Sequence, residues 1–122
     1  MLADLGGIEF DWFAADSEGN VALFATAGEG FLPEGVAENH EMHTAVAECL
    51  PAPRVGTAEV WLDYADAGLY VFDWALPGGP YELRASPSCE LKSAIKQQVL
   101  AVAYMPRFRG SFSRTTKVES WT

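Results

Sequence analysis

Two histidines in the first half of the chain are the first candidates for a metal or catalytic site. His40 and His43 lie in the run His-Glu-Met-His, and their spacing places both on one face of a helix. Zinc proteases hold the metal with histidines that are four positions apart, together with a further ligand. The spacing here is one residue short of that pattern, and histidines at this spacing commonly pack against the rest of the protein. The sequence therefore predicts no metal site and no cofactor.

Asp11 and Asp73 are candidates for acid–base chemistry. Each lies between aromatic residues in a segment that favours a strand. If the two strands are neighbours, the carboxylates meet on one face of the sheet, as paired acids do in general acid–base catalysis. In the simpler interpretation each carboxylate faces solvent or accepts a hydrogen bond from a loop, while the aromatic neighbours fill the core.

The cysteines and serines form no recognisable catalytic pattern. Cys49 and Cys89 are too few for a disulfide framework and lack the spacing of metal ligands. Cys89 lies at the N-terminus of a predicted helix, where a thiol is either unusually reactive or part of ordinary helix capping. No serine lies in the context of a nucleophile elbow. We therefore expect no catalytic residues and a protein that is not an enzyme.

Charge is distributed unevenly along the chain. The net charge is −9, and residues 1–53 contain ten acidic residues but no lysine or arginine. This balance argues against a nucleic-acid ligand, which requires a basic surface. Either folding brings the basic second part against the acidic first part, or an acidic surface is kept for a basic protein partner. The residues expected on such a surface are Glu34, Glu38, Glu41 and Glu48.

The hydrophobic pattern predicts an α+β fold, with an antiparallel sheet of about five strands and helices packed on one face. Strands are predicted over residues 8–15, 21–27, 69–76 and 81–85, and within residues 108–121. Helices are predicted over residues 33–50, 57–67 and 89–104. Residues 16–20 join the first two strands as a turn, because they lack the spacing and the closing Glu of a calcium loop.

The aromatic residues of two predicted strands should form the core. Phe10, Trp12, Phe72 and Trp74 each lie at alternate positions of their strands and so share one face. The sequence Phe-Asp-Trp occurs in both strands, and each copy opens a predicted hairpin. This repetition reflects either a duplicated ββα unit or coincidence in a chain rich in aromatic residues.

The length of 122 residues predicts a single domain. No apolar run is long enough to cross a membrane, and the start of the chain does not resemble a targeting segment. We expect a cytoplasmic protein.

Part of the sequence resembles a group of small uncharacterised bacterial proteins. The resemblance lies in Asp11-Trp-Phe-Ala-Ala-Asp16, a glycine turn, an apolar run from Val21 to Phe24 and a glycine-rich exit to Pro33. These residues cover about the first quarter of the chain, and Tyr70 to Pro80 is also similar. The group is similar to immunity-type proteins, many of them acidic α+β domains, which neutralise toxins between bacteria. The resemblance implies a bacterial, cytoplasmic, non-enzymatic protein and supplies no catalytic residues.

Two functions follow from these observations. The first is an immunity-like protein-binding module whose acidic surface meets a basic partner. The alternative is a small-molecule binding protein or minor enzyme with a pocket near Asp11 and Asp73. A cavity lined by aromatic residues and converging polar groups would favour the alternative, whereas a flat acidic surface would favour the first.

Overall fold

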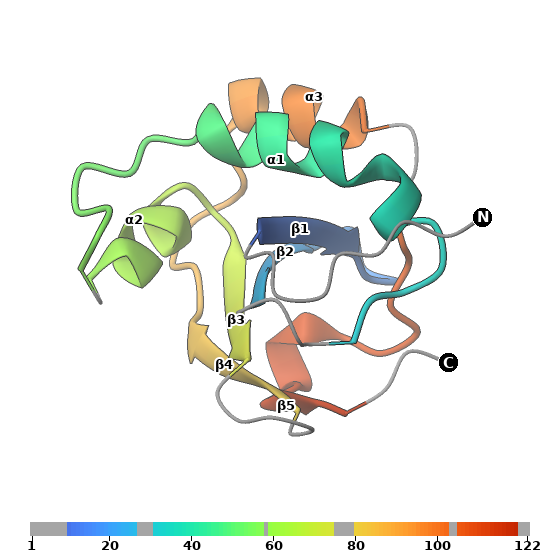
Figure 1. Ribbon diagram of the computed structural model, residues 1–122. Helices are drawn as coiled ribbons and strands as arrows, with labels where there is room; N and C mark the ends of the chain where they lie inside the picture. Colours follow the sequence, from blue (N-terminus) through green and yellow to red (C-terminus); the bar gives the residue numbers. More distant parts are fainter. Residues whose placement is uncertain (1–9, 27–30, 58, 75–79, 103–104, 120–122) are drawn as a thin grey trace.

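Five strands form one curled sheet, and their order in space is their order in the sequence (Figure 1). The computed structural model describes residues 10–26, 31–57, 59–74, 80–102 and 105–119, with all their side chains except that of Phe10. The strands are β1 (Phe10–Ala15), β2 (Val21–Thr26), β3 (Tyr70–Trp74), β4 (Tyr81–Ala85) and β5 (Lys117–Val118). The α+β class is confirmed.

Three α-helices pack against one face of the sheet, as the sequence predicted (Figure 1). They are α1 (His40–Glu48), α2 (Val60–Asp66) and α3 (Ser93–Leu100). The first lies against β1, the second against β3 and β4, and the third beside α1. Single turns of 3-10 helix are η1 (Ala37–Asn39) and η2 (Phe112–Arg114). Within the described residues no helix is both long enough and apolar enough to cross a membrane.

One pair of strands differs from the predicted antiparallel arrangement. β2 and β3 are parallel, whereas the other neighbouring pairs are antiparallel. The cause is the long connection from Thr26 to Tyr70, which contains α1 and α2. A connection of this kind crosses over the sheet and returns the chain to the end where the previous strand began. Hairpin patterns predict the pairing inside each hairpin but not the direction in which two hairpins join.

The helix predicted over residues 33–50 is shorter than its pattern indicated. Gly35 has a φ of 92°, and the chain passes through a turn and η1 before α1 begins at His40. A residue with positive φ interrupts a right-handed helix, so α1 cannot extend back to Pro33. The helices predicted over residues 57–67 and 89–104 are also shorter than predicted. The strand predicted within residues 108–121 is described as far as residue 119, and over that part the one strand is β5, which η2 precedes.

A row of aromatic side chains occupies the sheet face opposite the helices. Trp12 lies directly across from Phe24, and Phe24 lies across from Phe72. The rings stack with centroid distances of 4.3 Å for the first pair and 4.9 Å for the second. Trp12, Phe72 and Trp74 are buried, as predicted for the core. The side chain of Phe10, which was predicted with them, lies outside the described part of the chain.

Irregular segments rather than α-helices close this aromatic core. Val36, just before η1, and Phe112, in η2, are both fully buried there. The hydroxyl of Tyr81 accepts a hydrogen bond from Trp12 Nε1 at 3.2 Å and donates one to the carbonyl oxygen of Phe31 at 2.9 Å. The polar groups of these two large aromatic residues are thereby satisfied within the core.

Gly68 marks a close approach of two backbone segments. It has a φ of 100°, and a Cβ atom there would collide with Cα of Leu91 and the carbonyl oxygen of Glu90. The amide of Lys92 donates to the carbonyl of Ala67 at 3.1 Å, which holds the segment before α3 against the end of α2. Glycine meets both requirements, a left-handed conformation and the lack of a side chain.

We predict that Gly68→Ala destabilises the fold much more than Gly56→Ala. Gly56 also has a positive φ, of 90°, but a Cβ atom there would have nothing within 4 Å. An alanine at this position would only have to adopt the unfavourable left-handed conformation, which lowers the stability by about 1–2 kcal/mol. At Gly68 the collision with backbone adds to this cost, and we expect a loss of about 3 kcal/mol or more. Denaturant unfolding of both variants measures the difference, and equal losses would show that the segment before α3 moves away freely.

Candidate functional site

The four glutamates predicted for an acidic surface are all exposed. Glu41 and Glu48 lie on α1, Glu38 lies in η1, and Glu34 lies in the turn that precedes it. Because the helix is shorter than predicted, only Glu41 and Glu48 lie on α1, about two helical turns apart, and the four residues do not form one continuous helical stripe. These four residues are termed the acidic face below.

The opposite side of the same segment faces the protein. Val36, His43 and Leu50 are buried, while His40 and Ala47 are partly buried. The inward and outward sides of the segment therefore agree with the sequence even though the helix boundaries do not.

The acidic face has no cationic partner within the described structure. All lysines and arginines of the chain are described, and the ion pairs join Arg54 to Asp63 and Asp66, Arg84 to Asp73, and Arg114 to Glu18. None of the ion pairs among the described residues includes a glutamate of the acidic face. Folding pairs Glu18, an acidic residue of the first part of the chain, with the basic Arg114 of the second part. The four glutamates of the acidic face remain exposed to solvent.

The two histidines do not converge on a common point. His43 is fully buried, and its Nδ1 accepts a hydrogen bond from the Phe13 amide at 3.0 Å, so the ring proton lies on Nε2. His40 Nδ1 lies 2.9 Å from the carbonyl oxygen of Ala37, which can only accept a hydrogen bond. The described part of the chain contains no group of three or more potential metal ligands. His43 instead provides the hydrogen-bond acceptor for a backbone amide on the outer edge of β1.

Asp16 is a buried carboxylate that organises the turn between β1 and β2. Its Oδ1 accepts from the amides of Glu18 at 2.9 Å and Asn20 at 2.8 Å. Its Oδ2 accepts from the Asn20 side chain at 3.1 Å and from the Phe112 amide at 2.9 Å. Burial by itself would raise the pKa of Asp16, but these hydrogen bonds outweigh it and lower the pKa below 3.8. Both oxygens are used by donors of the chain, and the predicted turn is confirmed.

Asp11 and Asp73 face the same side of the sheet but are not neighbours. β2 lies between their strands, and Ala25 pairs with both residues. Two strand spacings separate the Cα atoms by about 10 Å. Asp73 lies 3.7 Å from Nε of Arg84, and burial raises the pKa of its carboxyl against the opposing effect of that guanidinium. The structure therefore does not bring the two carboxylates together as an acid–base pair.

Asp11 lines a cavity of about 450 Å³, termed the Asp11 cavity below. It lies among β1, α1, α2 and the loop that joins the two helices. Its apolar lining consists of Ala47, Leu50, Ala52 and Val55. Its polar lining consists of Asp11, Thr44, Glu48 and Tyr64. Asp73 does not line it, whereas Glu48 belongs both to this cavity and to the acidic face.

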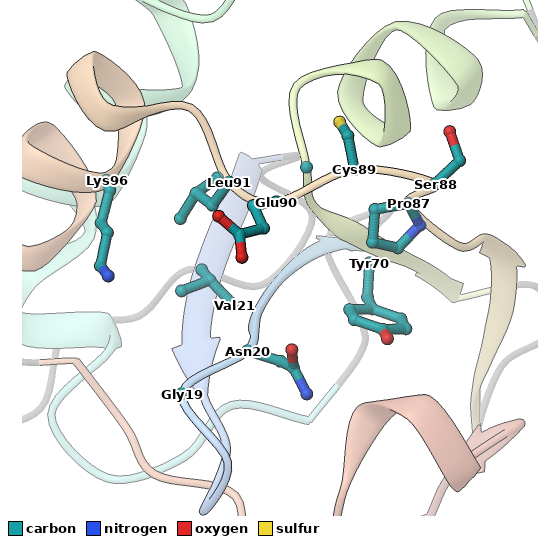
Figure 2. A pocket seen from close by; sticks show the side chains of 11 residues that line it. Gly19, Asn20, Val21, Tyr70, Pro87, Ser88, Cys89, Glu90, Leu91 and Lys96 are labelled. Carbon is teal, nitrogen blue, oxygen red and sulfur yellow. The ribbon is translucent and has the colours of Figure 1, made fainter.

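A second cavity, of about 560 Å³, lies near the starts of β2 and β3, under the segment that precedes α3 (Figure 2). Lys96 and Glu90 place opposite charges on its lining, and among its described lining residues Tyr70 is the one aromatic. The thiol of Cys89 turns away toward α2, with Sγ 3.4 Å from the carbonyl oxygen of Asp66. This cavity presents an exposed polar surface without an aligned nucleophile.

Comparisons of the chain with protein-family models, with curated proteins and with solved structures found no match.

Sequence reasoning found Asp11 and Glu48 as separate candidates but missed that they share a cavity. Thr44 and Tyr64 complete its polar lining, and no local pattern singled them out. Tyr64 lies within the helix predicted over residues 57–67, and its place in a cavity with Asp11 depends on long-range packing. A polar hydroxyl on an otherwise apolar helix face was the one available signal.

We predict that Asp16→Asn lowers the stability of the fold in a pH-dependent way. An asparagine cannot accept all four hydrogen bonds, and the loss at pH 7 should be about 1–3 kcal/mol. Because the pKa of Asp16 is lowered in the folded state, its contribution is full above the unfolded value of 3.8 and is lost as the pH falls through the folded pKa. Urea unfolding from pH 7 to pH 2.5 should show the two proteins converging at the acid end. A constant difference over that range would contradict a charged role for Asp16.

We predict that His43→Phe exposes the edge of β1. The ring volume is retained, but the Phe13 amide loses its acceptor, at an expected cost of about 1–3 kcal/mol. Amide hydrogen exchange should become faster at Phe13 more than elsewhere in β1. His40→Phe is the matched control because His40 is only partly buried and its ring contacts the adjoining turn. Unchanged exchange at Phe13 in the His43 variant would show that the hydrogen bond is dispensable.

Proposed function

We propose that this chain is a non-enzymatic protein-binding module whose acidic face attracts a basic protein partner. The observation that carries the proposal is that Glu34, Glu38, Glu41 and Glu48 are exposed and belong to no ion pair among the described residues, although every lysine and arginine of the chain is described. An immunity-like role and a cytoplasmic location are part of the proposal, and they rest on the resemblance of the first hairpin and on the sequence composition.

In the isolated protein the glutamates of the acidic face repel one another. Like charges at helical spacing repel by a few tenths of a kcal/mol per pair. In the described structure no lysine or arginine forms an ion pair with these glutamates, so they gain no stabilisation from such pairs. A positively charged surface would remove the repulsion and add attraction, which speeds association and selects partners by charge.

The alternative function, small-molecule binding near Asp11 and Asp73, has less support. The Asp11 cavity contains one of the two carboxylates and a single aromatic residue, Tyr64, among its described lining residues. Trp12, Phe24, Phe72, Trp74 and Tyr81 fill the core between the sheet and the segments around Val36 and Phe112. Neither cavity combines an aromatic lining with the pair of acids that the alternative required.

We predict that Glu38→Gln combined with Glu41→Gln keeps the fold and weakens capture of basic proteins. The immobilised protein would be exposed to bacterial lysate at low and at high salt, and bound proteins would be quantified by mass spectrometry. Capture by the wild type should fall with salt, because charges beyond about 8 Å are screened at physiological ionic strength. The double variant should capture less at low salt and show a weaker dependence on salt.

A matched control separates the acidic face from total charge. Glu90→Gln combined with Glu119→Gln removes the same charge from exposed residues outside the acidic face. This control should capture as the wild type does, and melting curves of all three proteins should agree within about 0.5 kcal/mol of stability. Equal capture profiles for the two double variants would mean that the acidic face is merely a solvated surface.

A further inference from the structure

The cavity under the segment that precedes α3 carries one negative and one positive side chain. Its volume is about 560 Å³, and it is termed the Lys96 cavity below. Glu90 comes from the segment before α3, and Lys96 comes from the first turn of that helix. Both residues are exposed, and Figure 2 shows the carboxylate of Glu90 directed into the cavity. The cavity therefore presents an anionic and a cationic group to the same ligand.

Neither charge of the Lys96 cavity is neutralised by an ion pair within the described structure. The ion pairs among the described residues include neither Glu90 nor Lys96, so the two side chains are paired neither with each other nor with a third residue there. An anionic ligand would be attracted by Lys96 but repelled by Glu90, and the reverse holds for a cationic ligand. A zwitterion meets both charges favourably. Because its own net charge is zero, it is also not repelled by the net charge of −9 of the chain.

Apolar side chains separate the two charges of the cavity. In Figure 2 the side chains of Val21 and Leu91 lie between those of Lys96 and Glu90, and both residues line the cavity. Val21 is buried and Leu91 is partly buried. A ligand that reaches both charges therefore crosses apolar surface, which favours methylene groups between its charged ends.

The backbone around Glu90 is held in place before any ligand binds. The carbonyl oxygen of Glu90 and Cα of Leu91 lie so close to Gly68 that a Cβ atom on the glycine would collide with both. The amide of Lys92 donates to the carbonyl of Ala67 at 3.1 Å. Binding at a preformed cavity requires less ordering of the protein, which favours affinity for a small ligand.

Asn20 offers a further hydrogen-bond acceptor whose direction is fixed. Its Nδ2 donates to Asp16 Oδ2 at 3.1 Å, and its backbone amide donates to Asp16 Oδ1 at 2.8 Å. These contacts leave the amide oxygen Oδ1 turned toward the cavity (Figure 2). An ammonium group has three donors, so a carboxylate and a neutral oxygen of one cavity together suit such a group better than a carboxylate alone.

We propose that the Lys96 cavity binds a small zwitterion whose ammonium and carboxylate are joined by a short methylene chain, as in 4-aminobutanoate. The ammonium meets Glu90, the carboxylate meets Lys96, and the chain lies on Val21 and Leu91. The lysine ammonium is a compact charge on a flexible stem and adapts to the position of the carboxylate. This inference goes beyond the proposed protein-binding function and does not rest on it, because no glutamate of the acidic face is among the described residues that line the cavity.

The test uses small zwitterions as probes in NMR titrations of the whole chain. Binding of 4-aminobutanoate or 6-aminohexanoate should shift the amide signals of Asn20, Glu90 and Leu91. The tighter of the two should bind about fivefold more tightly than its amide, which keeps only the ammonium, and than its N-acetyl derivative, which keeps only the carboxylate. Glycine, which has no chain between its charges beyond one carbon, should also bind more weakly. No shifts at the cavity, equal binding of the singly charged derivatives, or tighter binding of glycine would overturn the inference.

Two variants assign the charges of the ligand. Glu90→Gln should remove the advantage of the zwitterion over its N-acetyl derivative, and Lys96→Gln should remove its advantage over the amide. Glu119→Gln and Lys92→Gln are matched controls, since these residues are exposed but are not among the described residues of the cavity lining. Equal effects of the cavity variants and their matched controls would overturn the assignment of this cavity.

The double variant of Glu38→Gln and Glu41→Gln distinguishes this inference from the proposed function. It should bind the zwitterion as the wild type does, even where it captures fewer basic proteins, because its substitutions lie outside the cavity lining. A loss of zwitterion binding in this variant would place the ligand at the acidic face and overturn the inference.

Discussion

The stacked row of Trp12, Phe24 and Phe72 is the contact on which the arrangement of the whole sheet depends. Each ring comes from a different strand, and the three residues lie directly opposite one another in register. Paired aromatic rings contribute about 0.5–1.5 kcal/mol beyond the burial of their area. A slip by one residue would move every ring to the helix-covered face, so this row holds the parallel junction of the two hairpins in one register.

The same register decides what the opposite face of the sheet presents. The neighbouring positions bring Asp11, Ala25 and Asp73 into one row, with the small side chain between the two acids. The acids therefore have separate surroundings: α1 and α2 next to Asp11, and Arg84 next to Asp73. Arg84 is the extra residue of a bulge in β4, because Val71 pairs with Ala85 while the following Phe72 pairs with Leu83. A bulge can redirect a side chain in this way.

The outer edge of β1 is closed by contacts distant in sequence. The His43 side chain accepts a hydrogen bond from the Phe13 amide. Beyond it, the chain near Arg107 pairs with Ala15: the Ala15 amide donates a hydrogen bond to the carbonyl of Pro106, and the Ala15 carbonyl accepts one from the amide of Phe108. Exposed edge strands invite pairing with other chains, and these contacts occupy the edge of β1 at Phe13 and Ala15. The histidines that first suggested metal chemistry thus include one that protects the sheet.

Local patterns predicted what depends on neighbours in the sequence. Alternating aromatic residues located β1 and β3, and β4 has the predicted bounds of Tyr81–Ala85. Both Phe-Asp-Trp sequences lie in the first strand of a hairpin, as a duplicated ββα unit would require, and duplication stays a hypothesis. The same patterns could not predict the parallel pair, the bulge at Arg84 or the start of α1. These features depend on how the long connection crosses the sheet and on the positive φ of Gly35.

The site was predicted only in part, for a similar reason. The exposure of Glu34, Glu38, Glu41 and Glu48 followed from a helical period and survived the shortening of the helix. The cavity that Glu48 shares with Asp11 required the loop between α1 and α2 to fold back against the sheet. No spacing within the sequence encodes that contact, because its two sides are about 40 residues apart in the chain and meet only through tertiary packing.

Arg54 links the fold of this loop to the charge of the cavity. It is the first basic residue of the chain, and it binds the buried carboxylate of Asp63 through both its side chain and its backbone amide. Burial would raise the pKa of Asp63, but the contacts with Arg54 outweigh it and keep the carboxyl ionised. The interaction ties the loop between α1 and α2 to α2. Ala52 and Val55 of this loop thereby form part of the wall of the cavity. The interaction also directs the side chain of Arg54, the neighbour of Val55 in the sequence, toward Asp63 and Asp66 of α2, and Arg54 is not part of the cavity lining.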